Sequence, residues 1–86
     1  MRLDKYLKVS RIIKRRTVAA EACGAGRVCV NGKPVKASYE VKAGDHLEVS
    51  FGERIFRAEV LSVTETVRKE EAENMYRIEE GPHAGE

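Results

Sequence analysis

Apolar residues near the start of the chain recur at the spacing of a helix. Over residues 3–13 they return every three or four positions, which places them on one helix face. The members of this face are Leu3, Tyr6, Leu7 and Ile13. Charged residues are predicted to form a second stripe at helical spacing, made of Asp4, Lys8, Arg11 and Arg15. The pattern therefore predicts an amphipathic first helix.

A second helix is predicted to follow at once. Thr17 suits the N-cap position because its hydroxyl can accept a hydrogen bond from a free amide of the first turn. Gly24 and Gly26 suit the helix end, where the backbone often takes a left-handed conformation. The apolar face between these positions consists of Val18, Ala19, Ala22 and Cys23.

After Arg27 apolar and polar residues alternate, as they do in strands. Val28 and Val30 share one face, and Asn31-Gly32 suits a two-residue hairpin turn because both positions tolerate a positive φ. Further strands are predicted at residues 33–36, 39–41, 47–51 and 54–63, with turns at 43–45 and 52. We therefore expect an α+β fold with two N-terminal helices packed on a small, mainly antiparallel sheet of four to five strands.

The apolar pattern weakens from residue 65, where glutamate becomes frequent. The few apolar residues that remain leave a terminal strand, a short helix and a loose tail open as alternatives. Residues 81–86 are predicted to be disordered. The chain is thus divided into a single domain, residues 1–64, and an acidic, partly disordered C-terminal extension, residues 65–86.

Charge is distributed unevenly along the 86 residues. Residues 1–36 contain ten Lys and Arg against two acids, whereas residues 37–86 contain six against twelve. This division favours a nucleic-acid-binding face in the first part of the chain. Only three Tyr and two Phe are available for stacking on bases, so structured RNA read by shape and phosphate fits better than a single strand.

Catalytic, metal and membrane-spanning patterns are not visible in the sequence. His46 and His83 have no nucleophile in a recognisable arrangement, and Cys23 and Cys29 do not have the spacing of a zinc site. No segment approaches the ~18 apolar residues of a membrane span, and the N-terminus has no apolar secretory region. We expect a non-catalytic protein of the cytoplasm, with reduced thiols and without a cofactor or metal.

Four ordered motifs in about the first 50 residues are similar to those of the S4-type RNA-binding domain, also called the αL motif. They are Arg2-Leu3-Asp4, Arg16 just before the second helix, the hairpin of residues 26–32, which begins and ends with glycine, and the turn at Gly44-Asp45. One departure is the run of small residues in the second helix, where the family usually has bulkier apolar ones. This departure predicts a loosely packed second helix.

The resemblance implies which residues contact RNA. Arg2 and Arg16 match the RNA-contacting arginines of the family. Asp4 matches the family acid, which is expected to orient a neighbouring arginine or to touch RNA through a bridging contact. The other expected contacts, mainly to phosphates, are Lys5, Lys8, Arg11, Lys14, Arg15, Arg27 and Lys33.

The resemblance also implies partners, because the whole chain is similar to free-standing members of the family that act in ribosome-associated quality control. It implies binding to the large (50S) subunit carrying peptidyl-tRNA, with contacts to 23S rRNA and to the tRNA. It further implies cooperation with an RqcH-type factor in adding a C-terminal alanine tail to stalled nascent chains. The chain is expected to be a monomer off the ribosome.

Other functions stay open at this point. A heat-shock-type subunit recycling factor or a general structured-RNA-binding module would use the same domain, although the heat-shock relative ends in a basic extension and this chain ends in an acidic one. A modification enzyme would need a second domain with a catalytic Asp. A protein-interaction module could be built on the acidic C-terminal half.

Overall fold

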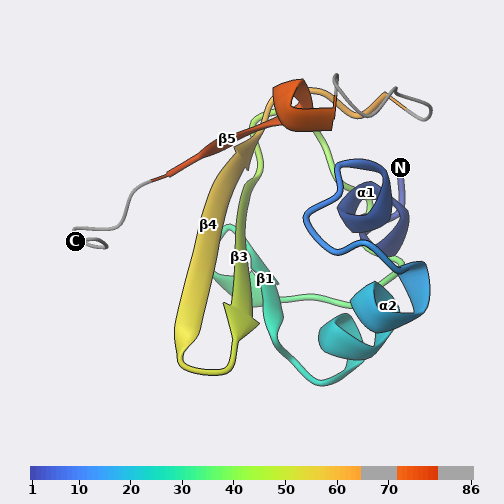
Figure 1. Cartoon of the computed structure of the whole chain (residues 1–86), viewed down its shortest axis with the longest axis vertical. Helices are drawn as coiled ribbons and strands as arrows, with labels where there is room; N and C mark the ends of the chain where they lie inside the picture. The colour runs from blue at the N-terminus through green and yellow to red at the C-terminus, as the bar shows by residue number, and fades with distance from the viewer. Residues whose placement is uncertain (65–71, 80–86) are drawn as a thin grey trace.

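Two short helices cover one face of a five-stranded antiparallel sheet in the computed structural model, which describes residues 1–64 and 72–79 (Figure 1). The helices are α1 (Leu3–Val9) and α2 (Arg16–Gly24). The strands are β1 (Val28–Val30), β2 (Lys33–Pro34), β3 (His46–Phe51), β4 (Arg54–Val60) and β5 (Tyr76–Ile78), in the spatial order β2-β1-β3-β4-β5. The predicted α+β fold class and sheet are confirmed.

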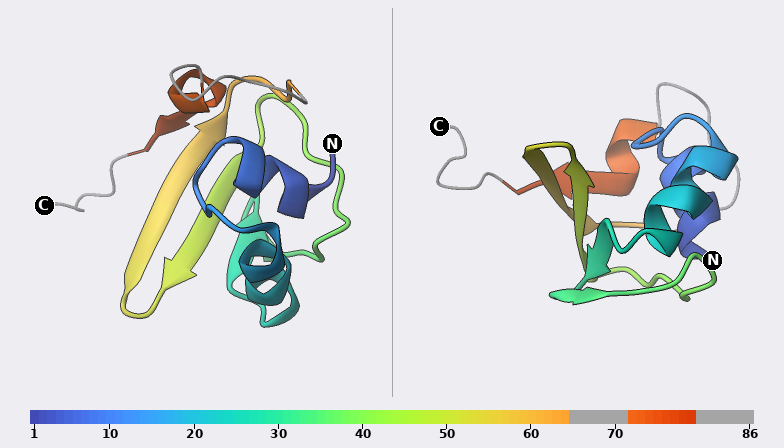
Figure 2. Two further views of the ribbon diagram at one scale, coloured as in Figure 1. Left: turned by 45° about the vertical axis from the view of Figure 1, so that its right-hand side comes forward. Right: turned by 90° about the horizontal axis from the view of Figure 1, so that it is seen from below.

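The core lies between the helix layer and the sheet, which Figure 2 shows edge-on. Leu3, Tyr6 and Leu7 of α1 are fully buried, and so are Leu47 and Val49 of β3. Strands β1 and β3 turn alternate side chains towards the helices, because successive residues of a strand face opposite sides of the sheet. Burial of these side chains holds the two layers together.

Helix α1 is shorter than the predicted residues 3–13. It ends at Val9, because Arg11 takes a left-handed backbone with φ 66° and the Ile13 amide donates to the Leu7 carbonyl at 3.0 Å. This turn folds Ile13 back into the core. The predicted charged stripe is therefore wrong beyond Lys8.

Helix α2 begins before the predicted cap. Arg15 occupies the N-cap position without a side-chain cap, and the Ala19 amide donates to its carbonyl at 3.0 Å. Thr17 is thus inside the first turn, and its prediction as N-cap was wrong. The predicted apolar face is only partly buried, since Ala19 and Cys23 face the core and Val18 is exposed.

The predicted turns at Asn31-Gly32 and at Gly44-Asp45 are present, and they contact each other. Asn31 and Gly32 have φ of 53° and 88°, as the hairpin turn requires. The Asn31 side chain donates to Asp45 Oδ1 at 3.2 Å and accepts from the His46 amide at 3.0 Å. Two motifs that are far apart in the sequence therefore form one hydrogen-bonded corner.

The strand predicted at residues 39–41 was wrong. This segment makes an isolated bridge between Arg2 and Glu40, and the Leu3 amide donates to the Tyr39 carbonyl at 2.8 Å. It pairs with the residues that lead into α1 and not with the sheet. The pairing fixes the backbone at Arg2. Strand β4 also ends at Val60, before the predicted residue 63.

The described part of the C-terminal segment, residues 72–79, is a short 3-10 turn, η1 (Glu73–Met75), followed by β5. Strand β5 pairs with β4, and Met75 is buried in the core. Residues 65–71 and 80–86 lie outside the described residues, and so does the predicted disorder of 81–86. The boundary after residue 64 stays a prediction. Across the described ranges, no helix is long and apolar enough to cross a membrane.

Candidate nucleic-acid interface

The starts of the two helices bring Arg2, Asp4 and Arg16 together. Arg2 is the N-cap residue of α1 and Arg16 is the first residue of α2, so both lie where their helices begin side by side. The Arg2 guanidinium donates to Asp4 from Nε at 3.2 Å and from Nη2 at 3.3 Å. The Arg16 Nε lies 3.4 Å from Asp4 Oδ2. One carboxylate thus holds two arginines.

The three side chains differ in exposure in a way that suits binding. The Asp4 side chain is 5% exposed, whereas those of Arg2 and Arg16 are 53% and 47% exposed. The carboxylate is therefore covered and the two guanidinium groups reach solvent. Each guanidinium keeps free donors that suit a phosphate.

The ionised form of Asp4 is favoured in this setting. Burial by itself would raise the pKa of the Asp4 carboxyl, but hydrogen bonds from Arg2, Arg16 and the Lys5 amide outweigh burial. The pKa of Asp4 consequently lies below its ordinary value. The carboxylate therefore stays charged at neutral pH and keeps its ion pairs with Arg2 and Arg16.

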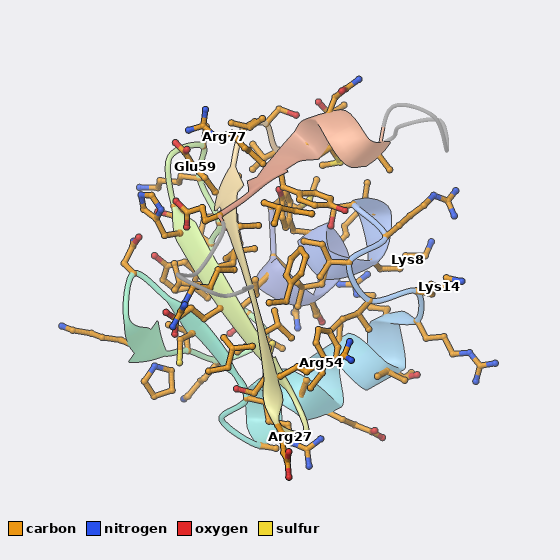
Figure 3. All side chains as sticks on the ribbon, turned by 60° about the vertical axis from the view of Figure 1, so that its left-hand side comes forward. Lys8, Lys14, Arg27, Arg54, Glu59 and Arg77 are labelled. Carbon is orange, nitrogen blue, oxygen red and sulfur yellow. The ribbon has the colours of Figure 1, made fainter. Side chains whose placement is uncertain are left out.

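Most of the other predicted cations lie exposed on the same helix layer. Figure 3 shows Lys8 and Lys14 projecting from one side of the molecule. Lys8, Arg11, Lys14 and Arg15 are all exposed, and no carboxylate of the described residues forms an ion pair with them. Lys5 is half-buried. The four exposed cations, Lys8, Arg11, Lys14 and Arg15, are available to a polyanion.

Arg27 and Lys33 lie elsewhere in the fold. Arg27 follows the end of α2, where its carbonyl accepts from the Ser50 amide at 2.9 Å. Lys33 is on β2, at the edge of the sheet. Neither residue is part of the Arg2–Asp4–Arg16 cluster.

On the outer face of the sheet, by contrast, two arginines form ion pairs. Arg57 forms an ion pair with Glu48 at 3.1 Å, and Arg77 with Glu59. Figure 3 shows Arg77 and Glu59 on the side of the molecule opposite to Lys8 and Lys14. Apart from Arg2 and Arg16, which Asp4 holds, the exposed cations named on the helix side form no ion pair with a described carboxylate, whereas Arg57 and Arg77 of the outer sheet face do. Within residues 1–64 and 72–79, no three His, Cys, Asp or Glu side chains are grouped to hold a metal ion.

One feature of this surface was missed by the sequence pattern. Val18 was predicted on the apolar face of the second helix and Phe51 in a strand, but their exposed fractions are 45% and 47%. Alternation along a strand gives the side to which Phe51 points and not how far the covering helix extends. The two residues line a groove beside α2.

Comparison with known proteins agrees with the fold. The family model described as "S4 domain" matches residues 1–47. A protein of Halalkalibacterium halodurans described as "RQC P-site tRNA stabilizing factor" is 55% identical over 78 residues, which are 91% of this chain and 89% of that protein. A protein of Bacillus subtilis with the same description is 51% identical over the full length of both chains.

A solved structure of similar fold is the trimeric heat shock protein 15 of Vibrio cholerae. It superimposes with a TM-score of 0.85 at 29% identity, covering 92% of this chain and 81% of that one. The matched residues 1–47 include Arg2, Asp4 and Arg16. The chain therefore belongs to the S4 domain family, and within it to the group of small proteins described as RQC P-site tRNA stabilizing factors.

Proposed function

We propose that this protein binds structured RNA on the large ribosomal subunit and stabilises a tRNA in the P site during ribosome-associated quality control. The observation that carries the proposal is the pair of half-exposed guanidinium groups, Arg2 and Arg16, held by the buried Asp4. The P site and the quality-control role in the proposal come from the description of relatives that are 51–55% identical.

The proposed mechanism is positioning without chemistry. The Asp4 carboxylate limits the rotamers of both arginines, so less conformational entropy is lost when they bind phosphates. The surrounding cations add electrostatic attraction and release of counterions. The proposed RNA-binding residues are Arg2, Asp4, Lys5, Lys8, Arg11, Lys14, Arg15, Arg16, Arg27 and Lys33, with Asp4 acting through the arginines.

The finer partners are part of the same proposal. We propose contacts with 23S rRNA and with the peptidyl-tRNA of a 50S subunit, in the cytoplasm, by a protein that is monomeric off the ribosome. With tRNA held in place, an RqcH-type factor would extend the stalled chain with alanine. The proposed role is that of a binding protein and not of an enzyme.

Sedimentation of a cell lysate through a sucrose gradient tests the proposal. The wild-type protein should travel with free large subunits, whereas Arg2→Ala and Arg16→Ala should remain at the top. Arg77→Ala is the matched control, because it removes an exposed cation from the outer sheet face. Wild-type protein that stays at the top, or an Arg77→Ala variant that is lost equally, would contradict the proposal.

A second function is favoured by one observation, the TM-score of 0.85 with heat shock protein 15. A subunit recycling factor of that type would also bind free large subunits. A cell that lacks the protein and expresses a stalling reporter separates the two functions. Loss of the alanine tail supports P-site stabilisation in tailing, whereas intact tails with accumulating large subunits support recycling.

A further inference from the structure

A groove runs between α2 and the hairpin that joins β3 to β4. It has a volume of about 500 Å³, and its floor includes Ile13, Val18 and Phe51. A second cavity, of about 430 Å³, shares these three residues, so the two form one continuous groove. A volume of this size is in the range of small-ligand sites, about 300–1,000 Å³.

The groove exists because α2 is built from small residues. Ala22 and Ala25 line its helix side and leave the space that bulkier side chains would fill. Phe51 ends β3 on the inward face, beyond Leu47 and Val49, and half of its side chain reaches solvent. An aromatic ring and aliphatic side chains are therefore presented together at the surface.

Cations lie at both ends of this apolar floor. Lys14 and Arg15 line one end, and Arg27 lines the other. Arg54, the strand partner of Phe51, lies at the same hairpin, and Figure 3 shows Arg27 and Arg54 at one end of the molecule. No described carboxylate forms an ion pair with these four residues. By contrast, Arg57 and Arg77 of the outer sheet face are paired.

We propose that this groove takes one unpaired nucleobase of the bound RNA, which stacks on Phe51 beside Val18. The flanking phosphates bind Lys14 and Arg15 at one end and Arg27 at the other. This inference rests on the proposed RNA-binding function and names a contact within it. The order cation, apolar floor, cation matches the order phosphate, base, phosphate along a nucleic-acid strand.

Among the described residues that line the groove there is one acid, and it fits this arrangement. Glu21 lies on the helix side of the floor, between the two cationic ends. Its carboxylate repels a phosphate at the middle of the groove and can accept a hydrogen bond from the exocyclic amino group of a base. A phosphate is therefore directed to the ends and a base to the middle.

The groove and the Arg2–Asp4–Arg16 cluster lie on different sides of α2. Arg16 and Val18 are two residues apart, which is about 200° around a helix. An RNA that contacts both sites must pass the N-terminal end of α2, which the exposed Lys14 and Arg15 directly precede. These two cations thus connect the sites.

Ultraviolet crosslinking of the full chain to purified bacterial 50S subunits carrying peptidyl-tRNA tests the inference. After ribonuclease digestion, mass spectrometry should find a nucleotide adduct on Phe51. Phe51→Leu keeps apolar bulk but removes the ring, and should weaken co-sedimentation with the subunits about tenfold. Phe51→Tyr keeps the ring and should bind like the wild type.

Ile55→Ala is the matched control, because Ile55 is a large apolar residue that is also about half exposed but points to the outer sheet face. Wild-type binding by Phe51→Leu, with adducts only near α1 and the start of α2, overturns the inference and leaves the proposed function intact. An adduct of Phe51 with a ribosomal protein also overturns it. If the wild-type protein does not bind the subunits at all, the proposed function fails and the inference falls with it.

Discussion

The Asp4 carboxylate is buried and has three partner residues. It accepts two hydrogen bonds from the Arg2 side chain and one from the Lys5 amide, at 2.8 Å, and it lies 3.4 Å from the Arg16 Nε. The partners of a buried charge offset the free energy of its desolvation. Removing either the charge or its partners therefore destabilises the folded state. Asp4 therefore contributes both to the start of α1 and to the orientation of Arg2 and Arg16.

We predict that Asp4→Asn lowers the free energy of unfolding at neutral pH by about 1–3 kcal/mol, because hydrogen bonds to a charged acceptor are lost. The folded-state pKa of Asp4 lies below the unfolded value of 3.8, so its contribution is present above 3.8 and is lost as pH falls through the folded pKa. Urea unfolding of both proteins from pH 7 down to pH 3 measures this convergence. A constant difference across that range would contradict it.

The two cysteines should differ in reactivity. Burial, followed by the negative charge of Asp4, raises the pKa of the Cys23 thiol to about 11. Cys29 is partly exposed on β1. Because the thiolate is the reactive form, an alkylating reagent at mildly basic pH should modify Cys29 in the folded protein and Cys23 only after unfolding. Mass spectrometry of peptides over time gives both rates, and equal rates would show that Cys23 is accessible.

At the scale of elements, residue types predicted the turns and strands better than the helix lengths. Asn31-Gly32 was correctly predicted because few residue pairs adopt two positive φ values. The end of α1 was missed because the left-handed backbone of Arg11 has no glycine to indicate it. The segment at residues 39–41 alternates like a strand, but it hydrogen-bonds to residues 1–3 at the N-terminus and not to the sheet.

The residues of the candidate cluster could be named from the sequence, whereas their geometry could not. Resemblance to the S4 family identified Arg2, Asp4 and Arg16, but it did not show that a single carboxylate contacts both arginines. The groove beside α2 was not predicted as a site, since it depends on how far the helix covers the sheet. Tertiary packing determines both features, and residue spacing in the sequence does not encode it directly.

Strand β5 is joined to the helix layer by a buried hydrogen bond. The Tyr6 hydroxyl donates to the Met75 carbonyl at 2.7 Å, and that carbonyl also accepts from the amides of Leu61 and Ser62. Tyr6→Phe removes one donor without leaving the carbonyl unpaired, so we predict a loss of about 0.5–1.5 kcal/mol in the free energy of unfolding.

Hydrogen exchange tests where that loss acts. Exchange should accelerate most for the amides of residues 76–78, which directly follow Met75. It should accelerate least for the amides of β1, which pairs with β3 and takes no part in this hydrogen bond. Thermal unfolding gives the accompanying change in global stability. Uniform acceleration across the sheet would show that Tyr6 supports the whole core and not the attachment of β5.

At the scale of the whole molecule, the cations of the helix layer and those of the outer sheet face differ in their pairing with carboxylates. Lys8, Arg11, Lys14, Arg15 and Arg27 are exposed and form no ion pair with a described carboxylate, and Asp4 holds Arg2 and Arg16. Cations of the outer sheet face pair with Glu48 and Glu59. A net charge of only +2 therefore coexists with one strongly positive side. Such a surface should orient the protein on a polyanion.

This difference in pairing predicts how binding to 50S subunits depends on salt. With about five phosphate contacts, the logarithm of the affinity should fall with a slope of about −3.5 to −4.5 against the logarithm of salt concentration. Arg16→Ala should make the slope less steep by about 0.7–0.9, because one contact is lost. Arg77→Ala should not change it, since the pairing of Arg77 with Glu59 keeps that cation out of the interface. Binding measured by co-sedimentation over a range of potassium chloride concentrations, extended to salt low enough for Arg16→Ala to bind, gives the slopes. A slope near zero would mean that the contact is made through apolar or protein surfaces, and the helix side would then lose its role as the RNA-binding face.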